Sequence, residues 1–471
     1  MCVGGKCSDN VLLKNYFFTM PTTLDCNIMK NVFGTNRMRA VFDSRRLLQS
    51  WLDVWAALAE AEADVGLIPE DAAKKIRSVA KAELYDLEKI GAGVEAGRHI
   101  LMPSIRALTE AAGDAGKYVH WGTTSQDIFD SGLVLQIKGA LEIIEEELRA
   151  QVGFLMPIAQ RYKAHAMAGR THWQHAVPIT FGLKVAFWID ELSRHLERIE
   201  HCRAKVLVCQ MSGSAGTFAS LGKQGPAVQE AFSRRIGLRL PDAPWYNMRD
   251  NFAELVSTLG MIAATTERIC TETGRLSSTE IGEVWEPQTK TQVGSSAMPQ
   301  KRNPINGERA VANCHLVRGL VPVMQGLMVV AHERDMSVTA AEWLLIPQVF
   351  ILLDGALGLA HRILSDLQVD PERMTKNLAL TGGGIVAEAV MYGLGEKMGR
   401  GEAHELTIKL ARQAHSEQKP LIDIMVKNDE VSQHLSVAQM QELVKPENYL
   451  GVAEPVVEKV LERVALQLKR S

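Results

Sequence analysis

Residues 44–66 read SRRLLQSWLDVWAALAEAEADVG, and their apolar residues recur with the spacing of an α-helix. Asp43 or Ser44 is available as the N-cap and Gly66 as the terminator. The stretch therefore predicts an amphipathic helix that buries one face. The residues expected on that face are Leu47, Leu48, Trp51, Leu52, Trp55 and Leu58.

The helical period continues along most of the chain. Four longer helices are expected at about 127–165, 180–209, 250–278 and 305–335, and a fifth at about 340–367, which Pro347 should kink or divide. Such lengths exceed the average helix of about 11–12 residues, and broad apolar stripes are typical of bundle helices buried on more than one side. We find no convincing run of alternating β-branched residues and no internal repeat. The predicted fold class is all-α, with three helical domains and a long central helix bundle.

Polar or glycine-rich breaks near 113–127 and 379–389 suggest the domain boundaries. We expect an N-terminal extension over 1–35, an N-terminal helical domain over 36–122, a central long-helix bundle over 123–370 and a C-terminal helical domain over 371–471. Because convincing helical pattern begins only near residue 36, Met20 is a plausible alternative start. The length of 471 residues also fits about three domains.

Composition excludes several classes of partner. Apolar residues make up 46% of the chain and the net charge is −3, as in an ordinary soluble protein without a basic field for nucleic acid or an anionic membrane. No run reaches the roughly 18 apolar residues of a membrane helix. The seven scattered cysteines contain no CxxC pair, which favours reduced thiols in the cytoplasm. A small anionic substrate would have to be held by local cations.

Three polar segments, here called islands, interrupt the helical pattern. The first island is HWGTTSQD, residues 120–127, in which Thr123, Thr124 and Ser125 bring three hydroxyls to a helix N-terminus, where anions are favoured. Capping by Thr124 and Asp127 is the structural alternative. Because capping needs only one hydroxyl, both interpretations stay open.

The second island is GRTHWQHAVP, residues 169–178, between two expected helices. His172 and His175, with His165 before the island, have the residue type of a metal site, but no second cluster offers partners at ligand spacing. Proton transfer by a histidine near its working pH and a merely structural histidine are the remaining interpretations.

The third island is GSSAMPQKRNP, residues 294–304. Its two prolines push the preceding residues toward extended backbone, so Lys301 and Asn303 should face one way and Arg302 the other. A solvated loop between helices would explain the charges, but not the restricted backbone together with the paired hydroxyls of Ser295 and Ser296.

The third island resembles the signature loop GSSxMPxKxNP of the fumarase/aspartase superfamily and matches it at every fixed position. The other two islands match the superfamily's remaining shared regions in the same order, and the resemblance runs from about residue 36 to the C-terminus. Within it, the chain is most similar to the branch of adenylosuccinate lyase and 3-carboxy-cis,cis-muconate cycloisomerase. SGSAGTFASLG, PWYNMRD, EIGEVWEP and the AEW at 341–343 resemble the cycloisomerase, whereas RTHWQ and HERDMS at 332–337 resemble the lyase.

The resemblance implies a homotetramer whose active sites each combine the three islands from three subunits. It also implies β-elimination on a small succinyl-type polycarboxylate, usually releasing fumarate, without metal or organic cofactor. Ser295 or Ser296 would be the base and His172 the general acid, with His99 assisting. The residues expected to bind substrate are Thr123, Thr124, Ser125, Gln126, Thr171, Gln174, Lys301, Asn303 and Arg39.

Two departures leave the substrate open. Trp343 stands where adenylosuccinate lyases typically have an arginine that contacts the nucleotide, and Gln300 stands where both branches usually have histidine. His172 favours a lyase that cleaves a C–N or similar C–X bond, because a lactonisation has no free leaving group to protonate. Cycloisomerase-type lactonisation is the alternative. The intact Ser295, Lys301, Asn303 and His172 argue against a catalytically silent structural member. A helical scaffold that only binds partners would leave the islands unexplained.

Overall fold

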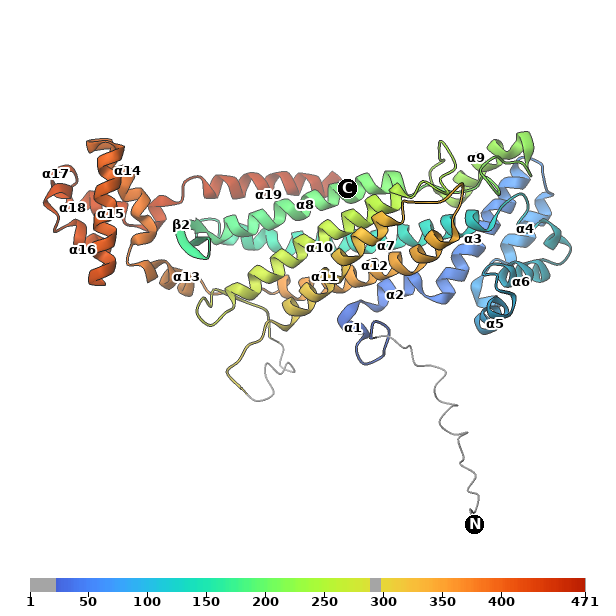
Figure 1. Ribbon diagram of the computed structural model, residues 1–471, viewed down its shortest axis with the longest axis horizontal. Helices are drawn as coiled ribbons and strands as arrows, with labels where there is room; N and C mark the ends of the chain where they lie inside the picture. The colour runs from blue at the N-terminus through green and yellow to red at the C-terminus, as the bar shows by residue number, and fades with distance from the viewer. Residues whose placement is uncertain (1–22, 289–297, 471) are drawn as a thin grey trace, which may run out of the picture. The chain divides into compact units, whose positions relative to one another are not determined.

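The computed structural model describes residues 23–288 and 298–470. Helices dominate this part of the chain and the strands are few and short, which confirms the all-α prediction (Figure 1). By contacts the chain divides into two compact units. The first unit holds the described residues up to Ile144, with Ile199–Ala264 and Ala312–Gly358; the second holds Glu145–Arg198, Thr265–Val311 and the described residues from Leu359 onward. The three-domain division with its boundaries stays a prediction.

The helix predicted from residues 44–66 is α3. It begins directly after Asp43, whose side chain accepts a hydrogen bond from the amide of Arg46 at 2.7 Å, and ends two residues before Gly66, which has a φ of 76°. Five of the six predicted face residues are buried, and Leu47 is exposed. The short helices of the first unit are α1 (Lys30–Phe33), α2 (Asn36–Phe42), α3 (Ser44–Asp64), α4 (Glu70–Val79), α5 (Leu87–Gly97), α6 (Met102–Ala112) and α9 (Gly225–Ile236).

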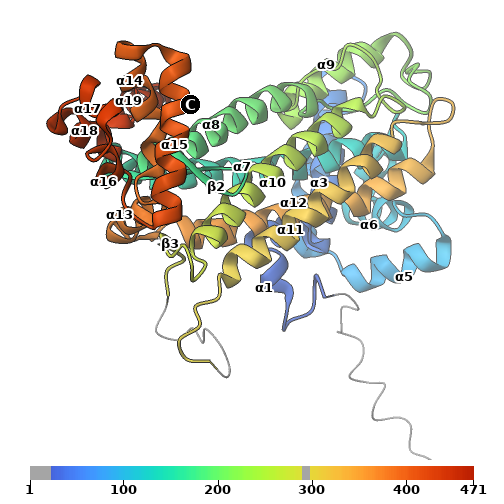
Figure 2. The same ribbon diagram turned by 60° about the vertical axis from the view of Figure 1, so that its left-hand side comes forward.

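Five long helices each contribute residues to both units (Figures 1 and 2). Pro347 lies inside the last of them without dividing it; of the two expected effects, the kink stays a prediction. A proline removes only one helical N–H donor, and the neighbouring Ile346, Val349 and Phe350 are fully buried, so packing holds the helix together. The five are α7 (Ser125–Arg161), α8 (Phe181–Val206), α10 (Asp250–Leu276), α11 (Ile305–Gly326) and α12 (Met336–Leu364).

The strands lie in the second unit. β1 (Ala166–Thr171) and β2 (Gln174–Thr180) form an antiparallel hairpin, and β3 (Val284–Trp285) pairs with β4 (Gln368–Val369). The hairpin corrects the sequence analysis, which read residues 169–178 only as a break between helices. The strands are short, β2 contains Pro178, and the turn carries neither glycine nor asparagine, so the usual hairpin signals are weak.

The C-terminal helices of the second unit form a core of their own. Val390, Leu394, Leu406, Leu410 and Met425 are buried together in this core. Both views show α14 to α18 grouped together (Figures 1 and 2). The helices are α13 (Pro371–Leu378), α14 (Ala387–Met398), α15 (Arg400–Glu417), α16 (Leu421–Met425), α17 (Asp429–His434), α18 (Val437–Leu443) and α19 (Ala453–Arg470).

One helix among the described residues, α12, is long and apolar enough to cross a membrane by length and composition alone. A bent pair of segments, Pro371–Thr381 with Gly384–Met398, passes the same test only when it is taken as one span. Because 72% of the apolar window of α12 is buried inside the chain, it has the character of a core helix. Packing against other helices accounts for its composition.

Candidate active site

A buried carboxylate organises the first island. Asp127 is 1% exposed, so its side chain needs hydrogen-bond donors. It receives them from its own loop, from the loop at 212–213 and from Tyr246. The donors are the Thr123 hydroxyl at 2.8 Å, the Thr124 amide at 2.8 Å, the Ser212 amide at 3.0 Å, the Gly213 amide at 3.3 Å and the Tyr246 hydroxyl. The N-terminus of α7 is thereby fixed by groups from three segments.

The hydroxyl of Thr124 has a different partner. It accepts a hydrogen bond at 2.8 Å from the guanidinium of Arg334, an exposed residue just before α12. The carboxylate of Asp127 accepts from the amide of Thr124, and this bond is one half of the capping box considered above. The hydroxyl of Thr124 makes the contact with Arg334 instead. A cation therefore stands at the N-terminus of α7, where an anion is already favoured.

The other predicted residues of this loop differ in exposure. Ser125 is the first residue of α7 and half-buried. Gln126 is buried and its amide donates to the carbonyl of Tyr246 at 3.3 Å. In the isolated chain, Ser125 and Thr124 face solvent more than Gln126 does.

The structure brings His99 to the first island. Its Nδ1 accepts from the amide of Met102 at 3.2 Å, at the start of α6, and its ring is exposed. His120, in the first island, accepts from Trp55 Nε1 at 3.0 Å. Burial, and then the charge of His99, lowers the pKa of His120 to about 4. His120 is therefore neutral near pH 7 and can donate through Nε2.

Arg39, on α2, is already engaged. Its guanidinium donates to Asp25 at 2.7 Å and to the carbonyl of Lys30 at 2.9 Å, and the side chain is 14% exposed. Burial lowers the pKa of Arg39, against the nearby Asp25 and Asp354. In this conformation Arg39 ties the segment before α1 to α2, so its predicted contact with substrate would require exchange of partners.

A buried ion-pair triad includes Asp130, which lies about one turn of α7 after Asp127. Arg249 donates to Asp130 at 3.0 and 2.9 Å and to both oxygens of Glu342, one of them at 2.8 Å; all three side chains are buried. Trp245 and Phe252 lie against the guanidinium, with ring centroids at 5.0 and 4.8 Å. The triad joins the residues after TSQD, the PWYNMRD stretch and the AEW stretch.

In the second unit, the hairpin places His172 at its tip. Thr171 pairs with Gln174, so His172 and Trp173 form a two-residue turn with φ of 50° and 67°. Such turns are normally built from asparagine and glycine, because other residues pay about 1–2 kcal/mol for the left-handed conformation. All four of these residues are exposed, and the Trp173 ring lies 4.3 Å from the Arg275 guanidinium.

The nearby histidines do not form a metal site with His172. His165 Nε2 lies 3.1 Å from the carbonyl of Pro371. Burial, and then Arg170, lowers the pKa of His175. Nowhere in residues 23–288 and 298–470 do three His, Cys, Asp or Glu side chains converge as metal ligands would.

Part of the third island, including Ser295 and Ser296, lies outside the described residues. Lys301 is exposed and Asn303 half-buried, just before α11. Arg302 donates to Gln368 at 2.8 Å and lies 5.3 Å from the Trp285 ring centroid. These contacts attach the described end of the island to Gln368 and Trp285, while the side chain of Lys301 is exposed.

Glu286, from the EIGEVWEP stretch, fixes the end of this island. Its carboxylate accepts from the Asn306 amide at 3.1 Å, the Asn306 side chain at 3.0 Å and the Gly307 amide at 2.7 Å. Burial raises the pKa of Glu286, and these hydrogen bonds oppose the rise. The sequence analysis missed this contact, because no local pattern links Glu286 to the residues at the start of α11.

Residues 32–319 match the protein family described as Lyase, and residues 383–460 match the family described as Adenylosuccinate lyase C-terminus. The chain belongs to this lyase family, within the fumarase/aspartase superfamily. N-acetyl-S-(2-succino)cysteine lyase of Enterococcus italicus is 37% identical over 438 residues, 93% of this chain and 96% of that protein. Adenylosuccinate lyase of Pyrococcus horikoshii is 40% identical over 439 residues, 92% of this chain and 96% of that protein.

Among solved structures, 3-carboxy-cis,cis-muconate lactonizing enzyme from Pseudomonas putida superposes with a TM-score of 0.88 at 36% identity, covering 92% of this chain and 98% of that chain. The fold of this lyase is thus shared with enzymes of more than one reaction. The specific reaction has to be argued from the site.

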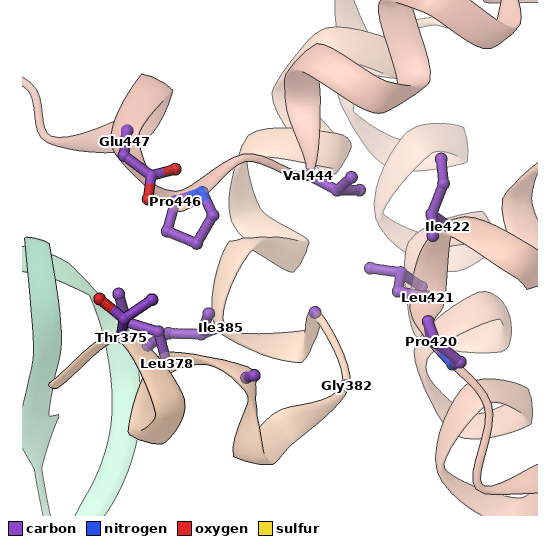
Figure 3. A pocket seen from close by; sticks show the side chains of 12 residues that line it. Thr375, Leu378, Gly382, Ile385, Pro420, Leu421, Ile422, Val444, Pro446 and Glu447 are labelled. Atoms are coloured by element: carbon purple, nitrogen blue, oxygen red, sulfur yellow. The ribbon is translucent and has the colours of Figure 1, made fainter. Parts of the chain in front are cut away.

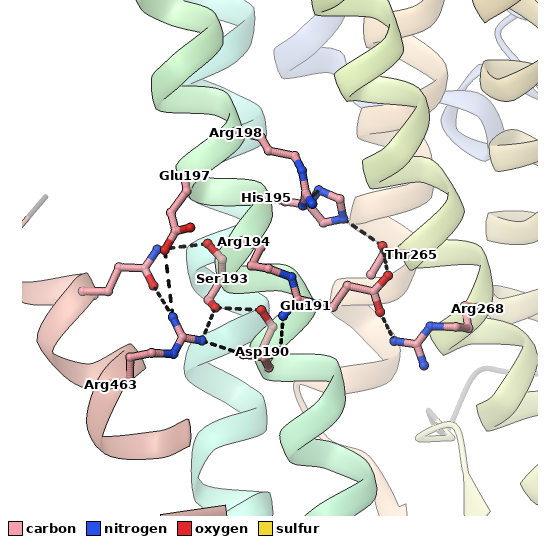
Figure 4. Close-up of polar contacts among 11 residues, drawn as sticks. Asp190, Glu191, Ser193, Arg194, His195, Glu197, Arg198, Thr265, Arg268 and Arg463 are labelled. Atoms are coloured by element: carbon pink, nitrogen blue, oxygen red, sulfur yellow. Dashed lines mark hydrogen bonds and ion pairs between the residues drawn. The ribbon is translucent and has the colours of Figure 1, made fainter. Parts of the chain in front are cut away.

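This lyase also contains a buried histidine that the sequence analysis did not single out. His195, on α8, lies 2.8 Å from the Thr265 hydroxyl, which donates to Glu191 at 2.6 Å (Figure 4). Because the Thr265 proton goes to Glu191, Nε2 of His195 carries the proton of their bond, and Nδ1 accepts from Arg198 at 3.3 Å. Burial, and then Arg198, lowers the pKa of His195 to about 4. It is neutral near pH 7 and joins α8 to α10.

A cavity of about 370 Å³ lies in the second unit between α13, the 382–385 turn and the segments at 420–422 and 444–447 (Figure 3). Leu378, Ile385, Leu421 and Val444 make its lining mainly apolar, with Glu447 as its acidic residue. A polycarboxylate needs cations and donors, so this cavity does not suit the substrate of such a lyase. None of the predicted site residues is among its described lining residues.

Proposed function

We propose that this protein catalyses β-elimination on a succinyl-type 1,2-dicarboxylate, cleaving a C–N or other C–X bond and releasing fumarate. The observation that carries the proposal is the placement of His172 at the tip of the hairpin. Two consecutive non-glycine residues with positive φ cost stability, and such strain is typically retained where function requires it. An exposed imidazole on a strained turn suits a group that must reach a substrate.

The reaction needs a base and an acid. The base, Ser295 or Ser296, takes the proton from the carbon next to a carboxylate, and the electron pair moves into that carboxylate as an aci-carboxylate. The pair then forms the C=C bond as the C–X bond breaks. His172 gives its proton to the departing group, which leaves as a neutral amine or thiol, and the remaining dicarboxylate is fumarate.

The extra negative charge of the aci-carboxylate must meet preorganised donors and cations. Lys301 and Asn303 supply a cation and an amide beside α11, and Thr124 with Arg334 supplies a hydroxyl and a second cation beside α7. Arg334 was not among the residues predicted from the sequence. Both groups stand at helix N-termini, where the backbone adds to the favourable potential.

We also propose that the working form is a homotetramer with shared active sites. The long helices expose large apolar side chains in the single chain: Phe187, Met261, Leu316, Val323 and Leu344 are 53%, 43%, 51%, 50% and 66% exposed. Single exposed apolar residues are ordinary, but a series of them along bundle helices suits burial against further copies. The first island belongs to the first unit and the other two to the second unit, so each has its own scaffold to present it.

Cycloisomerase-type lactonisation is the second candidate. The Arg249–Glu342 contact and the Trp343 ring, 4.6 Å from that of Phe129, build a frame from the stretches that resemble the cycloisomerase. The similarity to the lactonizing enzyme of Pseudomonas putida supports it as well. His172 favours elimination, because an intramolecular ring closure has no separate leaving group to protonate.

The test is a panel of succinyl adducts followed by the ultraviolet absorbance of fumarate. The panel contains adenylosuccinate, N-acetyl-S-(2-succino)cysteine, argininosuccinate, aspartate and nitrosuccinate, with carboxymuconate followed separately. We expect fumarate from one adduct and a loss of on the order of 10²–10⁴ in kcat for His172→Asn. Turnover of carboxymuconate alone would contradict the proposal and support the second candidate.

A further inference from the structure

The hairpin that carries His172 needs support from outside its own strands. β1 and β2 pair in a two-stranded sheet, and such a hairpin is marginally stable in water on its own. The left-handed conformations of His172 and Trp173 lower its stability further. Contacts with other segments must therefore fix the position of the tip.

A buried ion pair supplies the most directional of these contacts. Glu283 is 0% exposed, and its two oxygens accept from Arg170 Nη1 at 3.0 Å and Nη2 at 2.6 Å. Arg170 lies on β1, two residues before His172. A bidentate pair between two planar groups fixes orientation as well as distance, which a lysine could not do.

Glu283 is itself held from three directions. Its amide donates to the carbonyl of Leu276 at the end of α10 at 2.8 Å, and its carbonyl accepts from the amide of Asp370, just before α13, at 3.0 Å. The side chain of Asn377 on α13 donates to its carboxylate at 2.7 Å. The acceptor is therefore a fixed point of the second unit, and Arg170 transmits that position to the hairpin.

The base and the tip of the hairpin have weaker attachments. Ala166 and Ala168 of β1 are buried against Leu378, Ile385 and Val386. At the tip, the Trp173 ring lies under the Arg275 guanidinium, a contact worth about 0.5–1 kcal/mol at an exposed site. Neither contact is as directional as the bidentate pair.

We propose that Glu283 is a positioning residue, which through Arg170 sets the place and orientation of the hairpin tip and thereby of His172. It touches no substrate and acts only through the hairpin. The inference rests on the proposed function for the role of His172, and on the geometry alone for the position of the tip.

The test uses the full chain with Glu283→Gln, which keeps the size of the side chain but turns an amide N–H₂ toward a guanidinium donor. We expect kcat on the best succinyl adduct to fall by about 10- to 100-fold, because displacement of a reacting group by about 1 Å has costs of this order. KM should stay within about twofold, since the groups proposed to hold the carboxylates are unchanged. Arg170→Lys keeps the positive charge but loses the two parallel N–H donors. Its kcat should lie between those of wild type and Glu283→Gln.

The second readout follows the tip itself. In protein labelled with 5-fluorotryptophan, the ¹⁹F resonance of Trp173, assigned with Trp173→Phe, should shift or broaden in Glu283→Gln as the ring leaves Arg275. The control is Glu60→Gln in the first unit, which also loses a bidentate arginine contact, to Nε and Nη2 of Arg77 at 2.7 and 2.7 Å. It should leave kcat and the Trp173 resonance unchanged.

A Glu283→Gln protein with wild-type kcat, or with a lower kcat and an unmoved Trp173 resonance, overturns the proposal. If that variant does not fold, Arg170→Lys decides by the same two readouts. Failure of the proposed function appears differently: wild type then releases no fumarate from any adduct, while the Trp173 resonance still decides whether Glu283 positions the tip.

Discussion

Arg334 and Thr124, 210 positions apart in the sequence, are joined by a hydrogen bond of 2.8 Å between guanidinium and hydroxyl. The contact puts an exposed cation at the start of α7. Arg334→Ala should therefore raise KM for a dicarboxylate by about 10- to 100-fold, the equivalent of a charged hydrogen bond of about 1.5–3 kcal/mol. Steady-state kinetics with Arg234→Ala gives the control, because Arg234 is an exposed arginine that pairs with Glu230 on α9. An unchanged KM in Arg334→Ala would exclude Arg334 from the site.

The buried Glu62 should make the free energy of unfolding depend on pH. It is 0% exposed on α3, both of its oxygens lack a hydrogen-bond partner in the described structure, and burial raises its pKa to about 8. A carboxyl with a raised pKa contributes its full stability below the unfolded pKa of about 4.3, and this is lost as pH rises through about 8. The loss should be about 1.4 kcal/mol per pH unit within that window.

Glu62→Gln should remove this dependence, because the amide does not ionise. The measurement is urea unfolding at several pH values within the window, with Glu60→Gln on the same helix as control. An equal pH dependence in wild type and Glu62→Gln would show that Glu62 is not the group responsible.

Replacing different members of the buried triad should cost different amounts of stability. Arg249→Met leaves Asp130 and Glu342 buried together without a cation, and should cost about 3–5 kcal/mol. Glu342→Gln leaves Arg249 paired with Asp130, one charge of each sign, and should cost much less. Urea unfolding of both variants checks the order; equal losses would mean that the two carboxylates do not share one cation.

Replacing His172 with asparagine should change activity and stability in opposite directions. Asparagine tolerates the left-handed conformation better than histidine, so His172→Asn should stabilise the chain by about 0.5–1 kcal/mol while kcat falls. Gln418→Asn is the matched control, since Gln418 also has a φ of 50°, at the end of α15. It should gain stability without loss of activity. A destabilised His172→Asn would argue against strain at the tip.

The sequence predicted what depends on neighbouring residues. The apolar period of α3, its cap at Asp43 and its end before Gly66 are local features, and the structure has them as expected. The five long helices appear within a few residues of their predicted limits, except that α11 ends at Gly326. Pro347 does not divide α12, because its local cost is outweighed by burial on several sides, which no local pattern reveals.

The hairpin and the long-range polar contacts were harder to predict from the sequence. The turn of His172 and Trp173 has a strained left-handed backbone and lacks the glycine and asparagine that normally mark a hairpin. Arg334 and Glu283 contact Thr124 and Arg170, which lie more than 100 residues away in the sequence. Sequence spacing does not specify such pairs. The polar composition marked the islands and the resemblance gave them expected roles, but only the fold shows which contacts hold them.

Varying the leaving group shows whether His172 is the general acid of an elimination. Nitrite leaves without a proton, whereas an amine needs one. Comparing wild type with His172→Asn, we predict a loss of on the order of 10²–10⁴ in kcat/KM for a succinyl adduct of an amine, and almost no loss for nitrosuccinate. An equal loss on both substrates would mean that His172 is a structural residue of the turn and not the general acid.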